Sequence, residues 1–312
     1  MKNIFILIIF SFFMCNMAMA NSLRVVASIK PVHSIVSSIM YGVGNPILLV
    51  KDNSSPHEYS LRPSDGIMLD NADLIFWIGS EIESFLEKPL SSFNKTSNII
   101  TLSNSPNLHK ILLHKKKPSW LDFGNYKRGD HDHGSEIYDM HLWLDPTNTK
   151  HIAHVIAMEL IKKDPYNQKV YEQNEKEFVV KLEKLDKLLY EILQPVLEQK
   201  IVVFHGAYHH FKSHYGINIT ESVMPRSVSP GAKSFRRIKD GIISGNVSCV
   251  FYEPEFDSKI IKSITDDTGV NVGILDPEGI LLPAGPNLYF HLMEDLARSI
   301  AKKCKPANYN IL

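Results

Sequence analysis

Short hydrophobic runs alternate with helix-length segments along both halves of the chain. The runs are rich in Val, Ile, Leu and Phe, a composition typical of strands that are buried on both faces of a parallel sheet. The pattern therefore predicts an α/β fold with two lobes, each built on a parallel four-stranded sheet. The predicted strands cover residues 23–29, 46–50, 72–79 and 98–102 in the first half, and 200–205, 218–223, 247–253 and 271–276 in the second.

A different periodicity separates the two halves. Between residues 168 and 194 hydrophobic side chains recur every three or four positions, while lysines and glutamates take the other face. This spacing predicts one amphipathic helix of about seven turns. A coiled-coil dimer is the alternative, but Asn174 interrupts a run of fewer than four heptads. We therefore expect a monomer in which a single stiff helix joins the lobes.

The first 20 residues differ from the rest of the chain. Lys2 precedes an apolar run over residues 4–14, and Ala18-Met19-Ala20 forms a small-x-small cleavage site. The run is shorter than the roughly 20 residues that a membrane-spanning helix requires. We predict a signal peptide cleaved after Ala20, a periplasmic protein, and lobes at 21–165 and 196–312 joined by a linking helix at 166–195.

Charge and cysteine content indicate which partners and which covalent links to expect. The chain carries 34 basic and 34 acidic residues and has no basic stripe with interleaved aromatics, so we expect no nucleic-acid partner. Of three cysteines, Cys15 leaves with the signal peptide. The oxidising periplasm favours a disulfide between the remaining Cys249 and Cys304, and two free thiols are the alternative.

Candidate metal ligands follow the predicted strands. His57 comes after the run that ends at residue 50, while His205 and Asp276 are the last residues of their runs, and His141 opens a separate motif. Ligands of open parallel sheets bind outside the carboxyl ends of the strands, so two facing lobes would bring these side chains into one cleft. Three neutral imidazoles suit zinc better than magnesium, calcium or manganese.

A zinc hydrolase is one alternative, because three histidines with an open fourth position also describe catalytic zinc. Residues 205–209 even have the spacing of the H-E-x-x-H metallopeptidase helix, but Gly206 replaces the general-base glutamate. The sequence therefore predicts no enzyme. We expect His209, His210 and His214 to be helix-surface residues.

Two residues near His141 have expected structural roles. Asp145 precedes Pro146 and is predicted to be a turn or cap residue, or an acceptor that orients His141. Trp143 is predicted to lie in the core or in the wall of the cleft.

Taken together, the motifs resemble the zinc-binding periplasmic solute-binding components of ABC importers, the ZnuA type of the cluster A-I metal-binding family. The resemblance covers nearly all of the mature chain and implies two α/β lobes joined by one long helix. The motifs that carry it are Ser55-Pro56-His57-Glu58-Tyr59, Asp139-Met140-His141-Leu142-Trp143-Leu144-Asp145-Pro146, Val203-Phe204-His205, Glu253-Pro254-Glu255-Phe256 and Leu275-Asp276-Pro277-Glu278-Gly279.

The resemblance also implies a ligand set. His57, His141 and His205 match the zinc ligands of the family. Some relatives add a glutamate just before the first histidine, but Pro56 stands there in this chain. The fourth position is left to Asp276, which matches a metal-binding carboxylate of relatives, or to water. The paired cysteines of some members match Cys249 and Cys304.

By the same resemblance, the protein captures Zn²⁺ in the periplasm with high affinity and delivers it to an inner-membrane ABC permease and its ATPase. A manganese- or iron-binding member of the family and a metal-dependent adhesin are the alternatives. Relatives often carry a loop rich in histidine and acidic residues, and the segment 109–136 holds only four histidines. We hypothesise that this segment collects zinc weakly; a polar loop without a metal role is the alternative.

Overall fold

Two parallel four-stranded sheets form the framework of the molecule, as predicted. The computed structural model describes residues 23–51, 55–92, 98–113, 138–221 and 232–305. The first sheet has the order β2-β1-β3-β4 and the second the order β10-β9-β7-β8. Their strands are β1 (Val25–Ala27), β2 (Ile47–Leu48), β3 (Leu74–Trp77), β4 (Ile99–Thr101), β7 (Ile201–Val203), β8 (Ile219–Glu221), β9 (Cys249–Tyr252) and β10 (Asn271–Ile274).

A two-stranded antiparallel sheet was not predicted. It pairs β5 (Ile111–Leu112) with β6 (Tyr138–Asp139), with Ile111 opposite Asp139. Strands of two residues are too short to show any alternation of polar and apolar positions, so the sequence carries no periodic signal for them. The residues between them, 114–137, and the predicted signal peptide lie outside the part of the chain that the structure describes.

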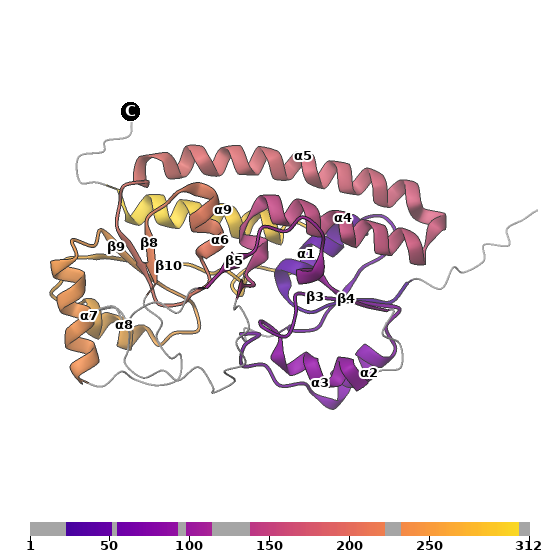
Figure 1. Ribbon diagram of the computed structural model, residues 1–312, viewed down its shortest axis with the longest axis horizontal. Coiled ribbons are helices and arrows are strands. Elements are labelled where there is room, and N and C mark those ends of the chain that lie inside the picture. The colour runs from indigo at the N-terminus through magenta and orange to yellow at the C-terminus, as the bar shows by residue number, and fades with distance from the viewer. Residues whose placement is uncertain (1–22, 52–54, 93–97, 114–137, 222–231, 306–312) are drawn as a thin grey trace, which may run out of the picture.

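Helices cover both faces of each sheet. Figure 1 shows α5 running along the whole molecule above both sheets, with α9, α4 and α1 between it and the strands. α2 and α3 cover the other face of the first sheet, and α7 and α8 that of the second. The bounds are α1 (Lys30–Ile39), α2 (Pro63–Asp70), α3 (Ser84–Ser92), α4 (Pro146–Lys163), α5 (Gln168–Leu193), α6 (His209–Tyr215), α7 (Ala232–Ser244), α8 (Ser258–Thr265) and α9 (Leu288–Lys303).

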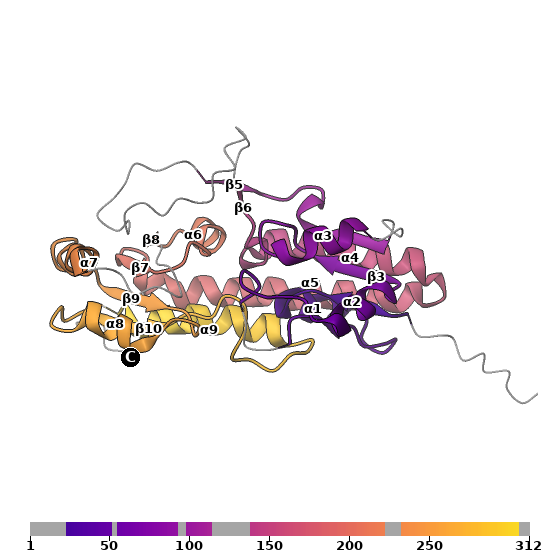
Figure 2. The same ribbon diagram turned by 90° about the horizontal axis from the view of Figure 1, so that it is seen from below.

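The strands send alternate side chains to different cores. In β7, Ile201 and Val203 enter the large core beneath α5, while Val202 packs against α7 and α8. The large core is continuous from the first sheet to the second, since it includes side chains of β1, α1, α4, α5, α9, β7 and β9. Each fully buried aliphatic side chain contributes roughly 1.5–3 kcal/mol to this packing. The two sheets are thus joined by one shared hydrophobic layer. Figure 2, which views the molecule from below, shows α5 extending behind both sheets.

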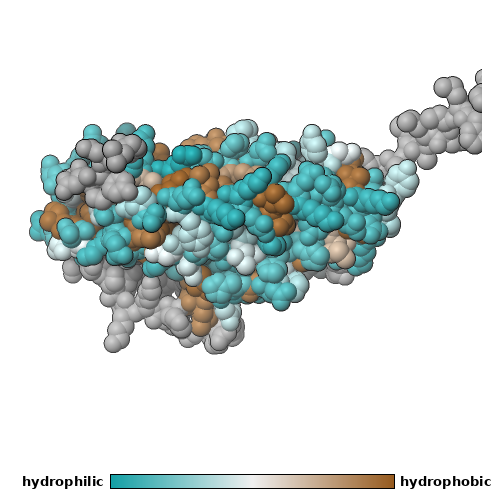
Figure 3. Space-filling view, turned by 90° about the horizontal axis from the view of Figure 1, so that it is seen from above, coloured by the Kyte–Doolittle hydropathy of each residue, from teal (hydrophilic) through white to brown (hydrophobic). Residues whose placement is uncertain are grey.

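The long helix matches its predicted range almost to the residue. Its apolar face is buried against α4, α9 and α1. Asn174, the polar interruption of that face, donates from Nδ2 to the carbonyl oxygens of Ile39 and Tyr41 at 2.8 Å each, at the C-terminal end of α1. Figure 3 looks onto the α5 side, where hydrophilic surface predominates and hydrophobic residues form separate patches. None of the helices in the described ranges is both long and apolar enough to cross a membrane.

One further connection joins the two halves, and a disulfide stabilises the second half. Lys30, at the start of α1, donates from Nζ to the carbonyl oxygens of Ile280 at 2.7 Å and Leu282 at 3.0 Å, in the segment between β10 and α9. The predicted disulfide is confirmed: Cys249 of β9 is bonded to Cys304 at the end of α9, with a Cα–Cα distance of 5.3 Å. A bridge that closes a loop of this length contributes about 2–4 kcal/mol to stability.

Candidate metal centre

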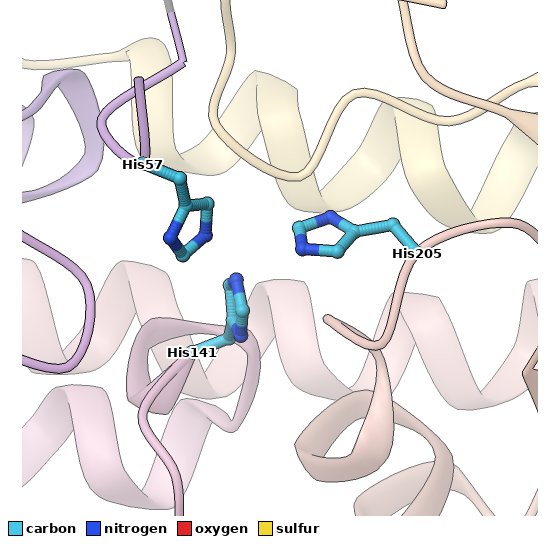
Figure 4. A group of neighbouring side chains, drawn as sticks. All are labelled: His57, His141 and His205. Carbon is cyan, nitrogen blue, oxygen red and sulfur yellow. The ribbon is translucent and has the colours of Figure 1, made fainter. Parts of the chain in front are cut away.

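Three histidines from distant segments face one another between the two sheets. His57 lies in a turn after β2, His141 follows β6, and His205 follows β7. Their ring centroids are 5.8 Å apart for His57 and His141, 5.5 Å for His57 and His205, and 5.2 Å for His141 and His205. One nitrogen of each ring lies within 4.8 Å of a nitrogen of the others. Figure 4 shows the rings converging on a common point.

The turn that carries His57 is anchored by a carboxylate. Asp65 Oδ2 accepts from the backbone nitrogen of Arg62 at 2.9 Å and from the hydroxyl of Tyr59 at 2.9 Å. Pro63 begins α2 directly afterwards, where the missing N–H of proline costs nothing. The first turn of α2 therefore holds the segment that presents the histidine.

Buried carboxylates orient the other two rings. Asp139 Oδ1 lies 2.7 Å from His141 Nδ1, and Glu253 Oε1 lies 2.7 Å from His205 Nδ1. With its proton on Nδ1, each ring donates to its carboxylate and keeps the lone pair of Nε2 for a metal, the arrangement found around ligating histidines. His141 Nε2 is buried and has no hydrogen-bond partner within the described ranges.

The charge of Asp139 is stabilised by its surroundings. Burial acts to raise the pKa of Asp139, but His141 and the nearby His209 and His210 hold it well below its usual range. The carboxylate therefore remains an acceptor over the whole physiological pH range.

Asp276 does not join the group of three. Its carboxylate accepts from the backbone nitrogens of Ile280 at 2.9 Å and Leu281 at 2.8 Å, in the turn that follows β10. Burial raises the pKa of Asp276, and these two amides partly oppose the rise. Within the described ranges, the ligand atoms that gather at this centre are those of the three histidines.

The predicted roles near His141 are partly confirmed. Asp145 caps α4, accepting from the backbone nitrogen of Thr147 at 2.7 Å. The acceptor that orients His141 is Asp139, which the sequence offers only as an acidic residue two positions earlier. Trp143 is fully buried and donates from Nε1 to the carbonyl oxygen of Pro277 at 2.7 Å, so it belongs to the core as expected.

The prediction that His209, His210 and His214 are surface residues is wrong for His210, and the side chains of His209 and His214 are only 18% and 14% exposed. His210 is completely buried and its Nε2 lies 2.9 Å from the carbonyl oxygen of Asp139. His214 pairs with Asp145 at 3.1 Å and with Asp186 of α5 at 2.8 Å. α6 packs against the turn at 142–144. This tertiary contact covers polar side chains that the sequence of α6 alone would suggest are exposed to solvent.

Known proteins are similar to this chain in sequence and in fold. The family model of the zinc-uptake complex component A, periplasmic (ZnuA), matches residues 25–303. The high-affinity zinc uptake system protein ZnuA of Brucella abortus (strain 2308) is 37% identical over 343 aligned residues, which cover 98% of this chain and 100% of that protein. The ZnuA protein of Yersinia pestis is 31% identical, with 88% of this chain covered.

A solved structure agrees with the sequence comparison. A crystal structure of ZnuA has a TM-score of 0.74 and 25% identity, covering 91% of this chain and all of that one. The similarity thus extends over both sheets, the joining helix and the segments that carry the three histidines. The chain belongs to the ZnuA family, the periplasmic component of zinc uptake.

Proposed function

We propose that this protein captures Zn²⁺ in the periplasm with high affinity and delivers it, as a monomer, to an inner-membrane ABC permease whose ATPase drives import. The observation that carries the proposal is the convergence of three imidazoles, two of them oriented by buried carboxylates. Nitrogen donors held in this way suit zinc. The curated relatives are named zinc uptake proteins, and a zinc-bound ZnuA deletion mutant has the same fold with a TM-score of 0.73.

The proposed ligands are His57, His141 and His205, with Asp276 in the fourth position. An ionised carboxylate has about four lone-pair sites. The two oxygens of Asp276 accept from the backbone nitrogens of Ile280 and Leu281, so acceptor capacity is left for a cation. Asp276 would thus close the coordination from the side of the second sheet without leaving its turn.

The surroundings of the histidines favour a carrier over a hydrolase. A catalytic zinc site needs a base beside the metal-bound water. Asp139 and Glu253, however, face the Nδ1 atoms of His141 and His205, on the side of each ring away from the proposed metal. Gly206 stands where a metallopeptidase helix has its glutamate.

Calorimetric titration of zinc into the metal-free mature protein tests the ligand set. We expect His141→Ala to weaken zinc binding by about a hundredfold or more. Loss of a direct ligand should reduce the affinity at least as much as loss of the residue that orients it. Asp276→Asn is expected to weaken it about tenfold. His154→Ala is the control, since His154 is exposed and paired with Glu175 on the α4–α5 surface.

Unchanged affinity in His141→Ala would refute the three-histidine centre. Unchanged affinity in Asp276→Asn alone would assign the fourth position to water. For delivery, zinc-loaded protein should stimulate the ATPase of the reconstituted permease complex, and metal-free protein should not. Equal stimulation by both forms would refute zinc delivery.

A further inference from the structure

A second cluster of metal-ligating side chains lies beside the three-histidine centre and shares no residue with it. His109 Nδ1 lies 3.9 Å from Asp145 Oδ2, and one ligand atom from each of His109, Asp145 and His210 falls within 4.8 Å of the others. His109 lies in the segment before β5, Asp145 is the N-cap residue of α4, and His210 belongs to α6. We propose that they form a second, weaker site for a divalent cation of the zinc class.

A buried amide fixes the position of His109. Asn148 of α4 is fully buried, and its Oδ1 accepts from the backbone nitrogen of His109 at 2.8 Å while its Nδ2 donates to the carbonyl oxygen of the same residue at 2.9 Å. The amide side chain of Asn148 thus bonds both the N–H and the carbonyl of His109, as a neighbouring β-strand does in a sheet. The side chain of His109 nevertheless remains 60% exposed, so a cation can reach it from solvent.

The Asp145 carboxylate presents one oxygen to the cluster. Oδ1 caps α4 through Thr147 and accepts from His214 Nδ1 at 3.1 Å. Oδ2 is the oxygen that lies toward His109. The carboxylate itself is almost completely buried, with 5% of its side chain exposed, which strengthens its attraction to a cation.

The imidazole of His210 is held as ligating histidines are held. Its Nε2 lies 2.9 Å from the carbonyl oxygen of Asp139. With the proton on Nε2, the ring donates to this carbonyl and Nδ1 carries the lone pair. A backbone carbonyl on the distal nitrogen is a common support for a metal-bound histidine. Nδ1 has one long contact, 3.4 Å from the Nδ2 of Asn148.

These donors define the class of ion. Two imidazoles and one carboxylate match the mixed nitrogen and oxygen ligands of zinc sites that leave a position for water. Magnesium and calcium prefer oxygen ligands alone. We expect weaker binding than at the three-histidine centre, because His109 is exposed and Asp145 already accepts two other hydrogen bonds.

Zinc titration past one equivalent tests the proposal in the metal-free mature protein. The wild type should bind a second zinc ion after the tight one. His109→Ala and Asp145→Asn should keep the tight event and weaken the second by about tenfold or more. Asparagine can still cap α4, so Asp145→Asn keeps the helix start intact. His154→Ala, an exposed histidine next to a carboxylate, is the matched control and should keep both events.

Two further variants separate this site from its alternatives. His141→Ala should lose the tight event and retain the second, so failure of the transport site and failure of this site are distinguishable. A variant with His131 and His133 both changed to alanine should retain the second event. If that variant lost it while His109→Ala kept it, the proposal would be overturned.

A zinc-soaked crystal gives an independent readout. An anomalous peak between His109, Asp145 and His210, absent from the His109→Ala crystal, supports the site. The proposal is refuted if the protein binds one equivalent of zinc only, or if the second event has the same affinity in wild type, His109→Ala and Asp145→Asn.

Discussion

At the scale of single residues, the centre depends on paired histidines and carboxylates. Glu253 accepts from His205 and, at 3.1 Å, from the hydroxyl of Tyr208. A buried carboxylate behind an imidazole fixes the ring and makes its distal nitrogen a better donor to a metal. The same contact sets which nitrogen carries the proton. Under the proposed ligand set, Asp139 and Glu253 would therefore act on the metal through the histidines.

We predict that Glu253→Gln weakens zinc binding by about 10–100-fold. Glutamine can still accept from Nδ1, but the negative charge that favours the bound cation is gone. Zinc calorimetry on metal-free protein measures the change. Glu175→Gln is the matched control, because Glu175 contacts His154 Nδ1 at 2.8 Å on the α4–α5 surface. Affinities within twofold of each other for Glu253→Gln and wild type would contradict the prediction.

At the scale of elements, a buried carboxyl connects β3 to α3. Glu83 Oε2 accepts from the backbone nitrogens of Ile78 and Gly79 at 2.9 Å each, just before α3 begins at Ser84. Burial raises the pKa of Glu83 to about 7, although the two backbone amides and the nearby hydroxyl of Ser28 act in the opposite direction. Folding therefore strengthens proton binding at this site.

The raised pKa of Glu83 makes stability depend on pH. Its protonated form favours the folded state below the unfolded pKa of about 4.5, and this contribution is lost as pH rises through about 7. The unfolding free energy of the wild type should therefore fall by about 2–3 kcal/mol from pH 5 to pH 8 because of this group. Glu83→Gln should lack this fall, so its stability relative to wild type should rise by the same amount over that range. Urea unfolding of metal-free protein measures it, with Glu87→Gln on the exposed face of α3 as control. If the unfolding free energies of Glu83→Gln and wild type differed by the same amount at pH 5 and at pH 8, the prediction would be wrong.

At the scale of the whole molecule, the two sheets are bound into one body. The core beneath α5 is continuous between them, and Lys30 connects α1 to the segment after β10. Wide opening about a hinge would break this buried layer, since cores do not deform continuously. Metal entry and release should instead depend on the loops that carry the histidines.

We predict that zinc changes the distance between the lobes by less than about 2 Å. Spin labels at Ile67→Cys on α2 and Ile243→Cys on α7, both exposed, report this distance by pulsed electron resonance. The native thiols are joined as Cys249–Cys304 and do not react with the label. A pair at Val170→Cys and Tyr190→Cys, both on α5, is the rigid control. A shift of many ångströms in the first pair alone would show a hinge.

Long or regularly patterned elements were predicted well from the sequence. The eight strands of the two sheets were found from short runs rich in Val, Ile, Leu and Phe, and the helix at 168–193 from its three- and four-residue hydrophobic periodicity. The β5–β6 pair and the burial of His210 were missed. β5 and β6 do not lie in apolar runs as long as those of the predicted strands, and His210 is covered by a neighbouring element and not by its own helix.

The sequence by itself determined the α/β class, the joining helix, the two cysteines that pair, and the three imidazoles, because each depends on local pattern or on residue type. Only the tertiary structure decided that Asp139 and Glu253 stand behind His141 and His205, and that His109, Asp145 and His210 meet. The physical reason is that periodicity describes the face of one element, whereas distances between residues far apart in the chain are set by how whole elements pack.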